Sequence, residues 1–395
     1  MDFNLDSSGP IRESVSILVG PNGSGKSSFL RDLAVRYCHD RNIVIVCNTP
    51  HDRFAGLRGT RRISVGKKEG SPKIIVKNAV AQSLAGSGAE FYQISSTLEY
   101  CGYRPRFGFR IEPGRLYGRT IDEIRLELQR PFDDELNLDI HKDDIENALG
   151  FLARHHESET IWIDVSEKVL EFSRSREFAA VLRLESKLRA WKVLRGMRVF
   201  LQRFDDDDAI EMRHASSGQL AMISSLLFLI ASAGENPLVI IDEPENSLHP
   251  TWQREYVEKV LTALSYRGAT VIVATHAPLV VTGALSDSPS IVSVFAVRNG
   301  VTQRLPIDSA ASAQSSIEEI LWRAFEVVTP ANHFVSEQIV AEVSRFEKGE
   351  TSKEDVLELI QRMEDKSFDE RQRSFFAAVK TLLGKVEAAR NENGQ

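Results

Sequence analysis

The stretch from residue 15 to residue 46 constrains the fold more than any other part of the chain. A short β-branched run, Val15–Val19, leads into the loop Gly-Pro-Asn-Gly-Ser-Gly-Lys-Ser at residues 20–27. An apolar helical pattern follows over Ser27–Arg36, and a second β-branched run covers Ile43–Val46. A strand, a glycine-rich loop, a helix and a second strand in this order predict a β-α-β unit of a parallel sheet.

The loop matches the phosphate-binding pattern GxxxxGK[ST] at every position. Its glycines allow the backbone to curl, so that successive N–H groups point at an anion from the start of the next helix. Lys26 then supplies a cation to the β- and γ-phosphates, and the Ser27 hydroxyl is a predicted Mg²⁺ ligand. The predicted phosphate site consists of Gly20, Pro21, Asn22, Gly23, Ser24, Gly25, Lys26, Ser27 and Ser28.

A second signal is the apolar run Leu238–Ile241, which reads as a strand covered on both faces and ends in two carboxylates. Asp242 is predicted to reach the Mg²⁺ ion, and Glu243 to polarise the attacking water as a general base. An ordinary strand with exposed acids at its tip is the alternative, which the phosphate loop elsewhere in the chain makes weaker.

Two weaker strings accompany these motifs. Ser216, Ser217, Gly218 and Gln219 precede an apolar helix that extends from about Gln219 to Ala233, and they predict either an anion-binding element or an ordinary helix cap. His276 follows the strand Thr270–Ala274, at the sheet edge where ligands collect in α/β folds. We expect this histidine to donate a hydrogen bond to the γ-phosphate.

The order GPNGSGKS, SSGQ, VIIDEPENSLHP, ATHAP resembles ABC-class ATPases. It is most similar to the branch that includes the SMC, RecF and OLD families and the AAA-type ATPases of bacterial anti-phage systems such as Septu. The resemblance covers roughly residues 1–50 and 205–305 and implies ATP and Mg²⁺ as ligands. It implies that residues 20–28 are the Walker A loop, Asp242 the Walker B aspartate, Glu243 the catalytic base and His276 the switch histidine.

The same resemblance implies a head-to-head homodimer in which Ser216–Gln219 of one subunit contacts the γ-phosphate held by the other. Two strings depart from the transporter pattern. The signature reads Ala-Ser-Ser-Gly-Gln at residues 215–219, where transporters more often have LSGGQ, and His249 stands where transporters usually place the D-loop aspartate. Gln82 and Gln93 are equal candidates for the Q-loop glutamine, and no aromatic platform for adenine is evident.

The fold class that follows is α/β, an ABC-type P-loop core with an inserted lobe and a helical C-terminal region. Helical periodicity from Thr120 to Lys192, interrupted by a strand at Thr160–Val165, predicts a mainly helical lobe. The expected parts are residues 1–115 (first half of the core), 116–196 (lobe), 197–305 (second half of the core) and 306–395 (helical region).

Three related activities fit the chain less well. A transporter subunit needs a membrane partner, and an SMC head needs the sustained heptads of a long coiled coil. An OLD nuclease needs a TOPRIM domain with a DxD cluster, and the 119 residues after His276 contain no DxD. The prediction is an ATPase switch for a separate effector, such as a nuclease or another toxin, in anti-phage defence. A RecF- or SMC-like ATPase of DNA repair or maintenance is the alternative.

Composition and charge add the remaining expectations. With 42% hydrophobic residues, 27% charged residues and three cysteines without a CxxC pair, the chain is expected to be cytoplasmic and to have no membrane partner. The net charge is −7, but Arg53–Lys77 holds eight Lys/Arg and one Glu, and Arg183–Arg203 seven and one. DNA or RNA is therefore a candidate partner, and an acidic protein surface is the alternative for these segments.

Overall fold

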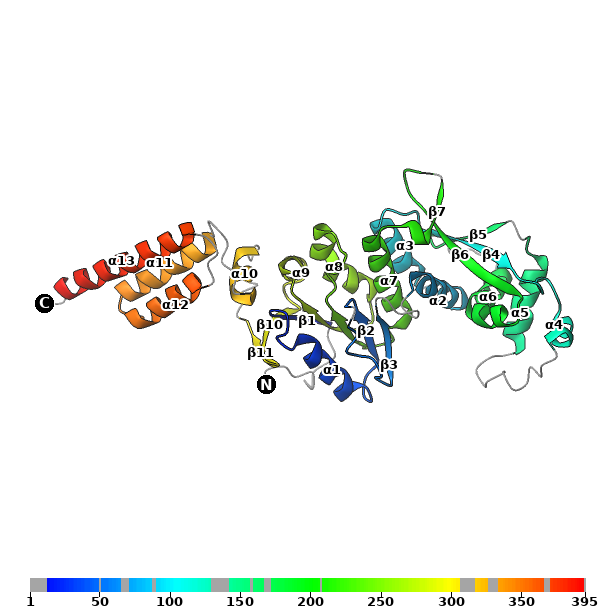
Figure 1. Ribbon diagram of the computed structural model, residues 1–395, viewed down its shortest axis with the longest axis horizontal. Helices are drawn as coiled ribbons and strands as arrows, with labels where there is room; N and C mark the ends of the chain where they lie inside the picture. Colours follow the sequence, from blue (N-terminus) through cyan, green and yellow to red (C-terminus); the bar gives the residue numbers. More distant parts are fainter. Residues whose placement is uncertain are drawn as a thin grey trace. The chain divides into compact units, whose positions relative to one another are not determined.

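The protein has a mixed α/β fold built on two β-sheets (Figure 1). The computed structural model describes residues 13–49, 51–64, 71–86, 90–128, 142–156, 159–166, 172–206, 208–305, 317–325, 333–365 and 370–393. Within these residues no helix combines the length and the apolar composition needed to cross a membrane.

The larger sheet has seven strands in the order β11-β10-β1-β9-β8-β2-β3. They are β1 (Ser14–Val19), β2 (Ile43–Cys47), β3 (Thr60–Ser64), β8 (Leu238–Asp242), β9 (Thr270–Thr275), β10 (Val292–Arg298) and β11 (Val301–Arg304). Strands β2, β8 and β9 are buried along their whole length, as continuous apolar runs covered on both faces should be. β2 pairs in parallel with β3 and β8, β1 with β10, and only the β10–β11 pair is antiparallel among the pairs described. The predicted strands are confirmed.

The chain forms two compact units, each described by itself. We call residues 1–33, 250–258 and 271–395 the phosphate-loop unit, and residues 34–249 and 259–270 the lobe unit. Helices α1 (Lys26–Tyr37) and α8 (Pro250–Ala263) begin in the phosphate-loop unit and end in the lobe unit. Pro250 occupies the first position of α8, where the fixed φ of proline and its missing N–H suit a helix start.

The lobe unit contains the second sheet, which is antiparallel and has the order β5-β4-β6-β7. Besides β2, β3 and β8 of the larger sheet, the lobe unit contains α2 (Pro72–Ala85), α3 (Phe91–Tyr100), β4 (Arg106–Pro113), α4 (Ile121–Leu128), α5 (Lys142–Arg154), β5 (Thr160–Asp164), α6 (Phe172–Ala190), β6 (Leu194–Gln202), β7 (Ala209–Glu211) and α7 (Ser217–Ser232), with a short 3-10 helix at Met212–His214.

Aromatic side chains join this sheet to the helices that pack against it. The ring of Phe178 on α6 lies 5.4 Å from Phe109 on β4 and 5.3 Å from Phe151 on α5. Helices α4–α6 fall within the predicted lobe of residues 116–196. Strand β4, which pairs with the predicted strand β5, lies outside it, and so does most of β6, which pairs with β4. The structure thus adds a sheet to the expected helical lobe, and the four-part division of the chain stays a prediction.

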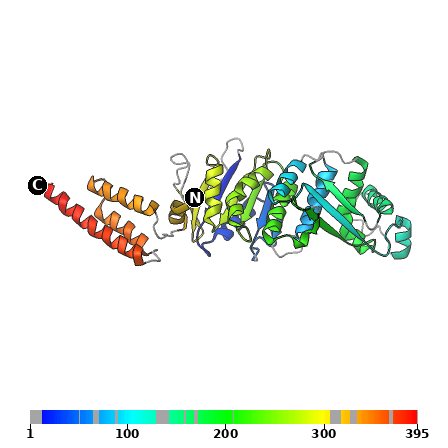
Figure 2. The same ribbon diagram turned by 90° about the horizontal axis from the view of Figure 1, so that it is seen from above.

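The phosphate-loop unit ends in three helices that share one core, drawn in orange and red in Figures 1 and 2. They are α11 (His333–Glu347), α12 (Lys353–Asp365) and α13 (Glu370–Asn393), and they lie in the region 306–395 that the sequence predicts to be helical. Helix α10 (Ile317–Phe325) adds Trp322 to this core. We call α11–α13 the C-terminal bundle. Its buried residues are Ile339, Phe346, Val356, Ile360, Met363, Phe376, Val379 and Leu383.

Four elements have no clear signal in the sequence. They are β3, β11, α3 and α9 (Pro278–Asp287). The two strands are short edge strands of the larger sheet, and polar residues occupy most of their positions. An edge strand forms because a neighbour supplies its hydrogen bonds, so its own composition predicts it poorly.

Basic residues of the segment Arg53–Lys77 are engaged within the fold. Arg61 donates a hydrogen bond to the carbonyl oxygen of Ser232 at 3.0 Å, and Arg62 forms an ion pair with Asp52 at 2.9 Å. These cations hold β3 to its surroundings. These two arginines are therefore engaged within the fold, whereas two further arginines of the segment are exposed.

The two basic segments also meet each other, because Lys77 of the first forms a buried ion pair with Glu185 of the second. The two side chains are 8% and 6% exposed. Burial, together with the nearby cations Lys73 and Arg189, lowers the pKa of Lys77 to about 8. The pair joins α2 to α6 in the interior of the lobe unit.

Replacing Glu185 with glutamine should lower the free energy of unfolding by about 3–5 kcal/mol, because the charge of Lys77 would stay buried without its counter-charge. Urea denaturation of the full chain measures the change. Glu146→Gln, which removes an exposed pair with Lys142, is the matched control and should cost about 0–1 kcal/mol. Equal losses in the two variants would contradict this account of the pair.

Candidate nucleotide site

The loop between β1 and α1 has the backbone that a phosphate loop requires. Gly20, Gly23 and Gly25 have φ angles of 152°, 82° and 98°. A Cβ atom at Gly20 would lie 2.7 Å from the carbonyl oxygen of Val297, and one at Gly25 would lie 3.1 Å from the amide nitrogen of Gly300. The backbone angles favour glycine at all three positions, and the close approach of the β10–β11 hairpin adds a second reason at Gly20 and Gly25.

Lys26 is the first residue of α1 and is 5% exposed. Its Nζ donates to the carbonyl oxygens of Gly20 at 2.7 Å and Pro21 at 3.1 Å, so the cation lies inside the curve of the loop. The Ser24 hydroxyl is buried beside it and makes no hydrogen bond within the described part of the chain. A cation, a curled backbone and an unsatisfied buried hydroxyl at a helix start fit a phosphate group.

The β10–β11 hairpin completes this part of the site. The sequence does not indicate that the hairpin lies beside the phosphate loop. The amide of Gly300 donates to the carbonyl of Ser24 at 3.1 Å. A cavity of about 480 Å³ opens next to the loop, and its walls are residues 20–24 of the loop, residues 296–299 of the hairpin and Phe325 of α10. The signal for the hairpin is weak, since its tip is only the pair Asn299-Gly300, both with positive φ.

The acidic strand tip lies in the lobe unit and is held by a network of its own. Asp242, 1% exposed, ends β8, and Glu243 follows it with a φ of +51°, as does Ser247 with +69°. The Asn246 amide donates to Glu243 Oε2 at 3.3 Å and to the carbonyl of Asn48 at 3.1 Å. Left-handed backbone at residues other than glycine is strained and concentrates at functional sites.

Asn48, rather than Gln82 or Gln93, is the polar residue next to this tip. The backbone N–H of Asn48 donates to the carbonyl of Asp242 at 3.0 Å, because β2 and β8 pair in parallel up to Cys47 and Asp242. Gln82 and Gln93 instead lie within α2 and α3. A polar residue directly after a buried strand is the sequence signal that would have found Asn48, but only the strand pairing places it beside Asp242.

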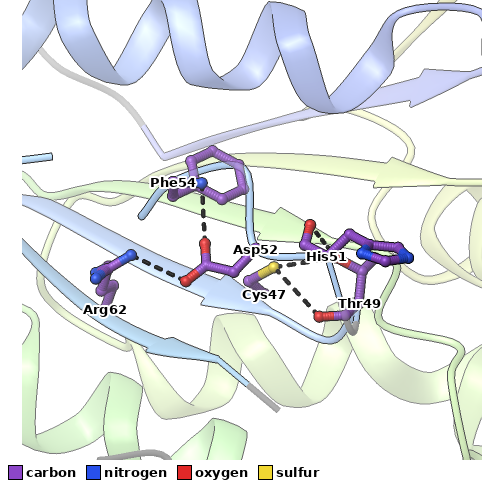
Figure 3. Close-up of polar contacts among 6 residues, drawn as sticks. All are labelled: Cys47, Thr49, His51, Asp52, Phe54 and Arg62. Carbon is purple, nitrogen blue, oxygen red and sulfur yellow. Dashed lines mark hydrogen bonds and ion pairs between the residues drawn. The ribbon is translucent and has the colours of Figure 1, made fainter. Parts of the chain in front are cut away.

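The loop after β2 is held by polar contacts of its own, which Figure 3 shows. The thiol of Cys47 contacts the Thr49 hydroxyl at 3.2 Å. Asp52 accepts the backbone N–H of Phe54 and the guanidinium of Arg62, both at 2.9 Å. Burial raises the pKa of the Cys47 thiol, so the thiol is kept neutral. These contacts give the loop that carries Asn48 one defined conformation.

The SSGQ string forms a capping box at the start of α7. Ser216 Oγ accepts the backbone N–H of Gln219, and Gln219 Oε1 accepts that of Ser216, both at 3.2 Å. Ser216 and Ser217 are exposed, whereas Gly218 is buried. The helix-cap interpretation therefore describes Ser216 and Gln219, and the helix begins at Ser217, two residues before the predicted start.

The Gln219 side chain also makes two hydrogen bonds outside the capping box. Its Oε1 accepts the hydroxyl of Tyr103 at 2.8 Å, and its Nε2 donates to the carbonyl of Cys101 at 3.1 Å. Tyr103 is fully buried. Gln219 thus joins the turn at Ser216–Ser217 to the segment between α3 and β4, and Ser217 is the exposed residue of the string without a role in the cap bonds.

His276 lies where the sequence predicts, at the turn between β9 and α9, and it is exposed. The backbone N–H of Ala277 donates to the buried hydroxyl of Thr275 at 2.9 Å, which shapes this turn. His276, Lys26 and Ser27 belong to the phosphate-loop unit, whereas Asp242, Glu243 and residues 216–219 belong to the lobe unit.

The donor set suits magnesium. Among the described residues, no group of three or more His, Cys, Asp or Glu side chains forms a dedicated metal cage. Mg²⁺ commonly takes one or two protein ligands and completes its shell with water and substrate phosphates. Ser27, in the phosphate-loop unit, and Asp242, in the lobe unit, each carry an oxygen donor of the kind that Mg²⁺ takes.

Comparisons with known proteins point to a nucleotide-binding class. Residues 146–282, which include Ser216–Gln219, Asp242, Glu243 and His276, match a family described as "AAA domain, putative AbiEii toxin, Type IV TA system". Protein ea59 of Escherichia phage lambda is 32% identical over 81 residues, which are 20% of this chain and 15% of that protein. The match thus spans well under two thirds of its length.

Solved structures give distant likenesses. An ATP-binding cassette of an ABC transporter in its ADP conformation is 13% identical, with a TM-score of 0.30, over 74% of this chain and 79% of that one. An Smc head domain from Pyrococcus furiosus, bound to the C-terminal domain of ScpA, is 12% identical, with a TM-score of 0.28, over 74% and 89%. These values are too low to transfer an activity to this chain.

Proposed function

We propose that this chain is an ATPase that binds ATP with Mg²⁺ and hydrolyses it when two copies associate head to head. The observation that carries the proposal is the phosphate loop, in which Lys26 lies against the carbonyls of Gly20 and Pro21 at the start of α1. The family match supports the class, because its description names an AAA domain.

Binding uses the loop and the two predicted magnesium ligands. The Nζ of Lys26 exchanges the carbonyls of Gly20 and Pro21 for phosphate oxygens, while the loop N–H groups surround the β-phosphate. Ser27 and Asp242 would hold Mg²⁺, which would supply positive charge against the phosphate groups.

Hydrolysis uses Glu243 as the general base that accepts the proton of the attacking water. The Asn246 amide donates to the Glu243 carboxylate and restricts its orientation. His276, exposed at its strand tip, donates a hydrogen bond to the γ-phosphate. Glu243 then accepts a proton in the transition state, and His276 stabilises the negative charge that develops on the γ-phosphate.

The second copy contributes the exposed turn at Ser216–Ser217. Backbone N–H groups at a helix start favour an anion, and the ordered turn offers them to the γ-phosphate of the partner's nucleotide. ATP then joins the two subunits, and hydrolysis releases them.

Two inactive variants should restore activity when mixed, if the sites are shared between subunits. Ser217→Arg places a bulky side chain on the exposed turn and preserves the cap bonds of Ser216, whereas Lys26→Ala removes the phosphate cation. Each variant alone should be inactive. In a mixed dimer, one site combines an intact Lys26 with an intact Ser217, so phosphate release should reappear in proportion to the mixed dimer formed.

Ser217→Ala is the control for the first variant and should keep most of the activity. Crosslinking with ATP shows whether mixed dimers form. Mixed dimers without restored activity would show that both sites must be intact, whereas active Ser217→Arg would contradict the role of the turn.

We further propose that the ATPase cycle switches a separate effector, such as a nuclease or another toxin, in anti-phage defence. The family description, which names a toxin of a Type IV TA system, supports this role, and the Septu-like assignment stays a prediction. Copurification from the native operon, with ATPase assays with and without DNA, tests it. The DNA-maintenance ATPase remains the second candidate and is tested by the same assays, although Arg61, Arg62 and Lys77 of the basic segments already have partners within the fold.

A further inference from the structure

The cavity beside the phosphate loop has more room than phosphates need. Its volume of about 480 Å³ lies within the range of pockets that hold small ligands, roughly 300–1,000 Å³. Phosphate groups require only the loop side, at Gly20–Ser24. The opposite side is formed by the hairpin residues Ala296–Asn299 and by the aromatic ring of Phe325 from α10.

We propose that this cavity takes the base of the bound nucleotide, with Phe325 as its stacking platform. The inference rests on the proposed function, since it concerns the same ligand. Every nucleobase has a π face that stacks on an aromatic ring, and such stacking tolerates different bases. Arg298 and Asn299 line the same cavity and offer polar groups to the ribose or the base edge.

Helix α10 also connects this platform to the C-terminal bundle. Trp322 lies three residues before Phe325 and is therefore its neighbour on the helix surface. Trp322 is 6% exposed and belongs to the buried core that also contains Ile339 and Phe346 of α11. A base stacked on Phe325 thus biases the position of α10, and α10 transmits nucleotide occupancy to the bundle.

The test compares ATP with inorganic tripolyphosphate, both with Mg²⁺, by calorimetric titration of the full chain. Phe325→Leu keeps apolar volume and removes the ring, so ATP should bind about 5- to 150-fold more weakly. Tripolyphosphate should bind as it does to wild type, which also shows that the variant is folded. Phe325→Tyr should bind ATP like wild type. Phe375→Leu, which removes a 40% exposed ring on α13, is the matched control.

The coupling has its own readout, hydrogen exchange of α11 and α12. Saturating ATP should change their exchange in wild type and in Phe325→Tyr, but not in Phe325→Leu. Unchanged exchange in wild type would overturn the coupling. If wild type binds ATP no more tightly than tripolyphosphate, or if Phe325→Leu binds ATP normally, the base site is wrong while the phosphate site stands. If wild type binds neither ligand, the proposed ATPase function itself fails.

Discussion

Replacing Glu243 with glutamine should slow ATP hydrolysis about 10²- to 10⁴-fold and leave ATP affinity near that of wild type. General-base catalysis contributes rate factors of this size, and the amide of glutamine cannot accept the proton of the attacking water. The oxygen of the new side chain still accepts the hydrogen bond of Asn246, which in the native protein joins the Glu243 carboxylate at 3.3 Å. Steady-state phosphate release and equilibrium ATP binding measure the two quantities separately.

The same variant should accumulate an ATP-bound dimer, because ATP joins the subunits and is not removed. Size-exclusion chromatography with ATP and Mg²⁺ compares its association with that of wild type. Glu235→Gln, at an exposed position of the lobe unit, is the matched control and should behave like wild type. A Glu243→Gln variant that hydrolyses ATP normally would remove Glu243 from the base role, and one that stays monomeric would contradict the shared site.

Replacing Lys26 with alanine should weaken ATP binding by at least about 100-fold, since hydrogen bonds to charged groups are worth about 1.5–3 kcal/mol each and Lys26 serves two phosphates. The same Nζ also donates to the carbonyls of Gly20 and Pro21, so the variant loses these contacts within the loop as well. Equilibrium binding of ATP by the full chain measures the loss.

Lys348→Ala is the control for this variant, because it removes an exposed lysine of the C-terminal bundle. Its affinity for ATP should equal that of wild type. Unchanged affinity in Lys26→Ala would show that the nucleotide does not bind at this loop, and it would remove the basis of the proposed ATPase activity. Thermal melting of both variants separates a lost contact from a lost fold.

The sequence by itself determined the features whose causes are local. Strands β2, β8 and β9 are runs of apolar residues bounded by polar ones, and each predicted strand ends within one residue of the observed one. The curl of the phosphate loop depends on glycines at fixed positions, so the string at residues 20–27 predicts it. The bundle helices follow from the amphipathic spacing of their own residues.

The antiparallel sheet of the lobe unit was decided by tertiary structure. β4 pairs with β5 and β6, which lie far along the chain, and the composition of a strand does not identify its partners. For the same reason Asn48 could not be placed beside Asp242 without the β2–β8 pairing. Phe325 likewise lines the same cavity as residues 20–24 only in the folded chain, because α10 lies far from the phosphate loop in the sequence.

Which charged and polar side chains are available was also settled only in three dimensions. The sequence shows two basic segments and a glutamine in the SSGQ string, and both patterns suggest ligand contacts. In the structure Lys77 is neutralised by Glu185, and Gln219 is bound by Tyr103. Charge and hydrogen-bonding capacity are properties of a residue and can be read from its letter. Whether a partner within the fold already satisfies them depends on contacts between distant segments, because burial favours pairing inside the fold over exposure to a ligand.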